Sequence, residues 1–162
     1  MSLLKENISF VVVCYKSSAA LKSLLISIPK ELEVVLVDNS NDKETSEIAN
    51  SYDCTLIQNQ ENIGYGAACN LGAEKASGTY LLFINPDSEL KPETLNELIK
   101  AADNYPNASA FNPKIIGRSG KQSFKRRSVL LQKSEWMSRK FTESDKDVSV
   151  LSGAAIFIKK EN

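Results

Sequence analysis

The sequence predicts an α/β fold in which a mostly parallel β-sheet carries helices on both faces. Short apolar runs rich in β-branched residues alternate with segments whose apolar residues recur at helical spacing. The runs are apolar throughout, as is typical of strands buried on both sides. The regular strand–helix alternation indicates right-handed βαβ units. With 162 residues and 42% hydrophobic residues, we expect a single domain, 1–162.

Four strand–helix pairs are expected in order along the chain. The strands are predicted at 8–15, 33–38, 54–59 and 79–84. The helices are predicted at 17–28, 41–52, 64–77 and 91–105. Pro29 closes the first helix, Asn41 or Asp42 caps the second, and Pro92 stands near the first turn of the fourth.

The alternation weakens after residue 105. Short strands around a Gly117–Gly120 turn and a further strand or strand pair at 147–160 are expected. Between them, residues 118–140 carry eight basic residues and one acid. Such a segment, which includes Trp136, is most simply a solvated face, and the alternative is peripheral contact with an anionic membrane surface.

Composition excludes several classes of function. The chain has no histidine, which excludes Ser-His-Asp and Cys-His catalysis and histidine-ligated zinc or iron. Lysine plus arginine equals aspartate plus glutamate at 20 each, so no global field favours nucleic acid. The three cysteines lack metal-ligand spacing and are expected to be reduced thiols. Without an apolar run of membrane-spanning length or a signal peptide, a cytoplasmic location is expected.

In open α/β sheets, ligands bind outside the carboxyl ends of the strands. Polar residues stand at several of these ends, namely Cys14–Lys16, Asp38–Ser40, Asn85–Asp87 and the glycine-containing turn Asn62–Gly66. We therefore expect them to gather at one edge of the sheet.

Each of these features has two interpretations. Asp38 begins an ordinary loop-and-cap sequence, or its carboxylate accepts the N3 proton of a pyrimidine base. The glycine-containing turn is a tight turn before a close-packed helix, or it receives a diphosphate at a helix N-terminus. Asp87 caps the next helix, or it binds Mg²⁺ or Mn²⁺ beside that diphosphate. Asn70 lies among small residues and needs a partner if it is buried.

Four segments carry a family resemblance: "VVVCYKS", "VVLVDNSNDKET", "NIGYGAACNLGAEKASGTYLLFINPDSEL" and "LSGAAIFIKK". Together they resemble family 2 glycosyltransferases of the GT-A (Rossmann-like) fold, nearest to the rhamnosyltransferase-like branch. The resemblance extends from residue 8 to residue 160. Residues 62–90 form its most specific part.

The resemblance implies a donor site for a UDP- or dTDP-sugar. Asp38 would read the pyrimidine base, and Cys14 and Tyr15 would line the base and ribose, although "CYK" stands where the family more often has Thr-Tyr-Asn. Further residues would shape the nucleotide and sugar pocket, namely Asn62, Gly64 and Asn70.

The resemblance also implies a metal cofactor, Mg²⁺ or Mn²⁺. Asp87 occupies the last position of the family's Asp-x-Asp motif, and Asn85 takes the first. Gly153 belongs to a segment beneath the donor sugar, and Arg126 or Arg127 in the basic hairpin would meet phosphate or acceptor.

The implied reaction is inverting transfer of a sugar, rhamnose or another hexose, to a saccharide or lipid-linked acceptor. The family's acidic segment that supplies the general base would lie beyond the Ser-Gly-Ala strand. No catalytic base is identified in this chain, so we expect it to be the N-terminal part of a longer enzyme. The alternatives are a non-catalytic nucleotide-sugar-binding module and a sugar nucleotidyltransferase. The latter would carry a glycine-rich loop with arginine and lysine after the first strand, where this chain has Cys-Tyr-Lys-Ser-Ser.

Overall fold

The computed structural model describes residues 7–117, 119–123 and 151–160. The chain divides into two compact units, residues 1–113 with 153–162, and residues 114–152. The strands of the first unit are β1 Ile8–Cys14, β2 Glu33–Asp38, β3 Thr55–Gln58, β4 Tyr80–Ile84, β5 Ala110–Phe111 and β8 Ala155–Lys159. Its helices are α1 Ser18–Ser27, α2 Lys43–Ser51, α3 Tyr65–Lys75 and α4 Thr94–Asn104.

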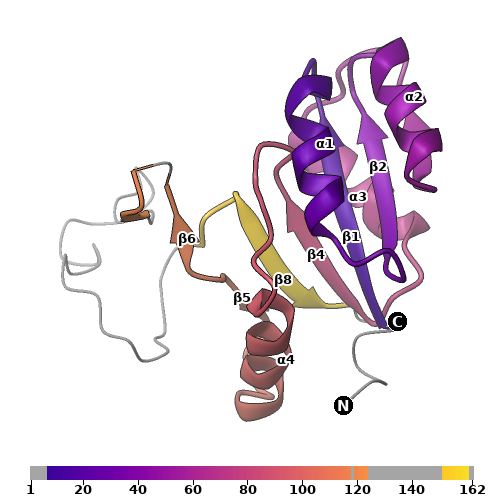
Figure 1. Ribbon diagram of the computed structural model, residues 1–162. Coiled ribbons are helices and arrows are strands. Elements are labelled where there is room, and N and C mark those ends of the chain that lie inside the picture. Colours follow the sequence, from indigo (N-terminus) through magenta and orange to yellow (C-terminus); the bar gives the residue numbers. More distant parts are fainter. Residues whose placement is uncertain (1–6, 118, 124–150, 161–162) are drawn as a thin grey trace, which may run out of the picture. The chain divides into compact units, whose positions relative to one another are not determined.

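The first unit is built on a six-stranded sheet with the order β3-β2-β1-β4-β8-β5 (Figure 1). Strand β1 runs parallel to β2 and β4, and β2 runs parallel to β3. Strand β8 is antiparallel to both of its neighbours, β4 and β5. The predicted mostly parallel sheet is confirmed, with an antiparallel element that the spacing of the segments did not indicate.

Helices cover both faces of this sheet, as predicted. Apolar side chains of α1, α2 and α4 pack on one face, and those of α3 pack on the other; in Figure 1, α1 and α3 lie on opposite sides of β1. Successive residues of a strand point to opposite faces, so Val12 and Leu36 join the first core while Val11 and Val37 join the second. This double burial explains why the strands are apolar throughout.

Helix α3 approaches the sheet closely because it carries Gly72. A Cβ at this position would lie 2.4 Å from Val11 Cγ1 and 3.2 Å from Val37 Cγ2. The predicted close packing is confirmed here. It does not extend to Gly66, where a Cβ would meet nothing within 4 Å. Gly66 therefore has no packing role within the described residues.

A hydrogen-bonded cluster lies at the amino-terminal ends of β1, β2 and β4. The buried Ser9 hydroxyl donates to the Glu33 carboxylate and accepts from the Gly78 N–H at 2.7 Å. Ser77 donates to the same carboxylate through its backbone N–H at 2.8 Å and its hydroxyl at 3.0 Å. Burial would raise the pKa of Glu33, but these hydrogen bonds outweigh burial and hold it below its usual value.

Two helix starts differ in how well the sequence predicted them. Asp42 is the N-cap of α2, as expected, and its carboxylate accepts from the Glu44 N–H at 3.2 Å. Helix α4 begins at Thr94 rather than near residue 91, with Glu93 as its N-cap. The chain makes a separate turn first, in which the Thr94 N–H donates to the Lys91 carbonyl. None of the helices in the described ranges is long and apolar enough to cross a membrane.

The second unit contains a short hairpin in its described part. Strands β6 Ile115–Ile116 and β7 Gln122–Ser123 are antiparallel. The Gly117 N–H donates to the Lys121 carbonyl, and the Gly120 N–H donates to the Gly117 carbonyl. The predicted turn is thus confirmed. Arg126, Arg127 and the predicted basic segment through Trp136 lie outside the described residues.

Candidate functional site

The carboxyl ends of the parallel strands bring several predicted site residues to one edge. Cys14 ends β1 directly beside Asp38 at the end of β2. Strand β4 lies on the other side of β1 and leads into the turn that carries Asp87. The glycine-containing turn follows β3 and opens α3. The parallel arrangement therefore produces the gathering that the strand-end rule predicts.

The Asp38 carboxylate serves the loop that follows β2. It is fully buried, and one oxygen accepts from the Ser40 N–H at 2.9 Å and from the Ser40 hydroxyl at 2.7 Å. The other oxygen accepts from the Asp42 N–H at 2.7 Å. This is the loop interpretation of Asp38. Its base-reading role stays a prediction, and because Asp38 is fully buried that role requires a movement that exposes the carboxylate.

Asn39 holds a place in the site that the sequence did not assign to it. It is 3% exposed, and its side-chain amide donates to the Gly64 carbonyl at 3.3 Å. Its side-chain oxygen accepts from the Asn59 amide at 2.8 Å. Asn39 therefore ties the end of β2 to the segment that leads into α3. The polar run Asp38–Asn41 after β2 was the sequence signal for this role. Within that run, a binding role was predicted only for Asp38.

The glycine-containing turn is ordered by its own residues. The Asn62 side-chain oxygen accepts from the Gly64 N–H at 2.9 Å, so this exposed asparagine shapes the turn. Gly64 has a φ of 85°, a conformation that favours glycine, and it is the N-cap of α3. In the part of the chain that the structure describes, a Cβ at Gly64 or at Gly66 would meet nothing within 4 Å. The bare backbone at the start of α3 is thus open to close approach by a ligand.

The Asn-Pro-Asp sequence forms a tight turn after β4. The Ser88 N–H donates to the Asn85 carbonyl at 3.1 Å, with Pro86 at the position where its fixed φ suits a turn. Asp87 is exposed and lies before the N-cap of α4, so it is not the cap of that helix. Its side chain has no hydrogen bond or ion pair within the described residues.

Residues 153 and 154 connect the glycine-containing turn to the Asn85 turn. The Asn85 N–H donates to the Ala154 carbonyl at 3.0 Å. The Tyr65 hydroxyl, from the first residue of α3, donates to the Gly153 carbonyl at 3.4 Å. Gly153 is exposed, and a Cβ there would meet no described residue within 4 Å. Burial and the neighbouring Cys69 raise the pKa of Tyr65 to about 12, so its hydroxyl remains a donor at neutral pH.

Two predicted site residues, Cys14 and Asn70, have other surroundings than expected, whereas the ring of Tyr15 is available at the surface as expected. Cys14 is fully buried in the core beneath α1, so its side chain lines no surface, and burial raises its pKa to about 12. Asn70 is exposed on α3, so it does not need the buried partner that its small neighbours suggested. Tyr15 is 50% exposed, and the Lys16 ammonium lies 5.5 Å from its ring centroid.

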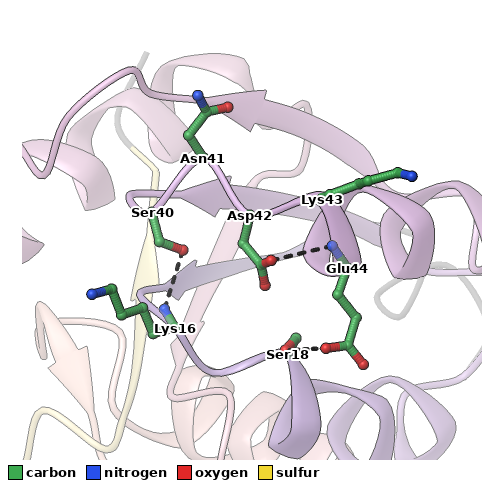
Figure 2. Close-up of a pocket in the computed structure, with 7 residues that line it drawn as sticks. All are labelled: Lys16, Ser18, Ser40, Asn41, Asp42, Lys43 and Glu44. Atoms are coloured by element: carbon green, nitrogen blue, oxygen red, sulfur yellow. Dashed lines mark hydrogen bonds between the residues drawn. The ribbon is translucent and has the colours of Figure 1, made fainter.

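An open hollow of about 370 Å³ lies between the loops after β1 and β2 and the starts of α1 and α2. Figure 2 shows the residues that line it. These residues are Lys16, Ser18, Ser40, Asn41, Asp42, Lys43 and Glu44. The Lys16 N–H donates to the Ser40 hydroxyl at 3.1 Å, and the Ser18 hydroxyl donates to Glu44 at 2.9 Å. The first bond joins the two loops, and the second joins the first turns of α1 and α2. Because the hollow contains lysines and acids together, its charge favours no particular ligand.

The chemistry of the Asp87 turn fits a hard divalent cation in a limited way. Within the described ranges, no three Asp, Glu, Cys or His side chains come together as a metal site. Asp87 therefore offers a single exposed carboxylate, with the Asn85 amide two residues before it. Mg²⁺ and Mn²⁺ bind through one or two carboxylates when substrate phosphates supply further oxygens. The residues fit an ion that binds together with a diphosphate.

The fold and this edge define an α/β domain of the GT-A type. The Glycosyl transferase family 2 profile matches residues 9–161, and the chain belongs to this family. It is 31% identical over 121 residues to the low-salt glycan biosynthesis hexosyltransferase Agl10 of Haloferax volcanii, a match that covers 71% of this chain and 38% of that protein.

Two solved structures have a similar fold. S. aureus TarS in complex with UDP-GlcNAc is 28% identical with a TM-score of 0.63, over 74% of this chain and 37% of that one. A mannosyltransferase from Pyrobaculum calidifontis, in complex with GDP-Man and Mn²⁺, is 22% identical with a TM-score of 0.58, over 64% of this chain and 34% of that one. The chain thus spans well under half the length of each of these three proteins.

Proposed function

We propose that this domain binds the nucleotide-sugar donor of a glycosyltransferase. The donor is a UDP- or dTDP-sugar, and the enzyme transfers its sugar to a saccharide or lipid-linked acceptor with inversion. The observation that carries the proposal is the open backbone at the carboxyl edge of the sheet. Among the residues that the structure describes, Gly64, Gly66 and Gly153 each have free space where a side chain would stand, and the Asp87 carboxylate at the same edge has no partner.

The parts of this edge match the parts of a nucleotide-sugar. The start of α3 offers N–H groups to the diphosphate, since the first N–H groups of a helix have no partner within it. The exposed ring of Tyr15 offers a surface for the base or ribose. A UDP-sugar is supported by TarS, which binds UDP-GlcNAc and is 28% identical to this chain.

Transfer breaks the bond between the sugar C1 and the diphosphate oxygen and forms a bond from C1 to an acceptor hydroxyl oxygen. The sugar passes through an oxocarbenium-like state, as in glycoside hydrolysis. The attacking hydroxyl loses its proton to a general base, for which no residue of this chain is assigned. The bond electrons leave with the nucleoside diphosphate.

Asp87, with Asn85 beside it, would hold the divalent cation. A bound Mg²⁺ or Mn²⁺ supplies Lewis-acid neutralisation of charge on the leaving diphosphate. The tight turn at Pro86 limits where the Asp87 carboxylate lies relative to β4. We further propose that the transferred sugar is rhamnose or another hexose. The similarity to the hexosyltransferase Agl10 supports a hexose as the transferred sugar.

Thermal unfolding with nucleotides tests the proposal. A ligand that binds only the folded state raises the unfolding midpoint by mass action. We expect UDP or dTDP with Mn²⁺ to raise the midpoint more than ADP or GDP does at the same concentrations. If none of the four nucleotides shifts the midpoint, the donor-binding proposal is wrong. Equal shifts for purines and pyrimidines would remove the preference for a pyrimidine base.

A further inference from the structure

Tyr65 reaches across the candidate site from one functional turn toward another. As the first residue of α3, it directly follows Gly64, whose backbone is open to a ligand. Its hydroxyl donates to the Gly153 carbonyl, although the two residues are 88 positions apart in the chain. A helix that starts with a large aromatic residue is thereby joined to the segment before β8.

The next carbonyl of that segment is joined to the opposite side of the site. The Ala154 carbonyl accepts from the Asn85 N–H at 3.0 Å, and Asn85 begins the turn that carries Asp87. Two successive carbonyls, those of Gly153 and Ala154, thus link α3 to the end of β4. Only the Tyr65 end of this link depends on a side chain.

We propose that Tyr65 is a positioning residue whose hydroxyl, acting through Gly153 and Ala154, sets the Asn85–Asp87 turn relative to the glycine-containing turn. This inference rests on the proposed function, in which one turn receives the diphosphate and the other holds the cation. A diphosphate that contacts both turns requires a defined spacing between them, because its oxygens are close together.

A ligand-free measurement tests the positioning directly. Tyr65→Phe removes the hydroxyl and keeps the ring, so the packing of α3 is preserved. We expect amide hydrogen exchange at Asn85 to accelerate about threefold to tenfold, the effect of losing one hydrogen bond. Exchange at Leu82, in the middle of β4, should not change. Unchanged exchange at Asn85 would overturn the proposal.

Two further variants isolate the Gly153 contact. Tyr105→Phe makes the same chemical change in an exposed tyrosine at the end of α4, and it should leave exchange at Asn85 unchanged. Cys69→Ala removes the thiol that lies near the Tyr65 hydroxyl while keeping that hydroxyl. If Cys69→Ala accelerates exchange at Asn85 as strongly as Tyr65→Phe does, the thiol is the working partner and the proposal is wrong.

Binding of UDP to the full chain gives the functional readout. We expect Tyr65→Phe to weaken UDP binding in Mn²⁺ about threefold to tenfold and to leave UDP binding in EDTA unchanged. A residue needed only for folding would weaken both equally, and this outcome would overturn the positioning role. If the unchanged protein does not bind UDP, the proposed function fails, and exchange at Asn85 alone decides whether Tyr65 holds the turn.

Discussion

The side chain of Asn39 at the end of β2 donates a hydrogen bond to the carbonyl of Gly64, the N-cap of α3, at 3.3 Å. This contact joins two segments that are separated by 25 positions in the chain. The side-chain oxygen of Asn39 also accepts from the Asn59 amide, so both polar atoms of the Asn39 side chain are hydrogen-bonded. The conformation of the glycine-containing turn therefore depends on a residue of another strand.

Replacement of Asn39 by Asp should destabilise this turn. The variant retains an acceptor for Asn59 but faces the Gly64 carbonyl with an oxygen, so we expect a loss of about 1–3 kcal/mol in the free energy of unfolding at pH 7. The repulsion raises the pKa of the new carboxyl in the folded state. Its protonated form donates again, so the deficit should shrink as the pH falls below that pKa. Urea unfolding at several pH values measures this, and a deficit independent of pH would contradict the donor role.

Replacement of Asp87 by Ala should remove the metal-dependent part of UDP binding. Because the side chain is exposed and lies before the α4 cap, the thermal midpoint without ligand should change little. We expect UDP affinity in Mn²⁺ to fall about tenfold or more and affinity in EDTA to stay the same. Glu89→Ala is the matched control, an exposed acid nearby that pairs with Lys91 at 3.7 Å. Loss of folded structure without a change in metal dependence would show that Asp87 is structural.

Two glycines of α3 should respond in opposite ways to alanine. Gly72→Ala places a Cβ 2.4 Å from Val11 Cγ1, and we expect it to destabilise the fold by about 1–3 kcal/mol. Gly66→Ala meets open space in a helix, so stability should be unchanged or higher by up to about 1 kcal/mol. The same methyl group should weaken UDP binding if the diphosphate approaches this backbone. Thermal unfolding and UDP titration of both variants separate packing from binding.

Stability should depend on pH through Glu33. Its pKa is lowered in the folded state, so the unfolded chain binds the proton more readily in the acid range. The contribution is therefore complete above the ordinary value of 4.5 and is lost as the pH falls through the lower folded value. We expect Glu33→Gln to unfold more easily at pH 7 and to show a smaller loss of stability on acidification. Urea unfolding at several pH values tests this expectation. The control is Glu31→Gln, the same substitution at a nearby exposed glutamate.

The amino-acid pattern predicted the fold well because the relevant signals are local. An apolar run such as residues 8–14 has few stable options other than a strand buried on both sides. Asp42 predicts the helix that starts at Lys43, because its N-cap interaction involves only the next few residues. The position of β8 in the sheet could not be predicted from the sequence in the same way. Its antiparallel pairing with β4 joins residues far apart in the chain, and no local pattern specifies such a partner.

The sequence by itself determined the types of group available at the strand ends, including the Asp87 carboxylate and the glycines that open α3. Only the tertiary structure decided which of those groups are free. Asp38 and Cys14 stand at strand ends as predicted, yet one is occupied by loop N–H groups and the other lies in the core. Tyr65 gained its role only when folding brought Gly153 within reach. The periodicity that predicts helices and strands depends on residues that are close in the sequence. Hydrogen-bond partners depend on distances between residues that are set only when the chain folds.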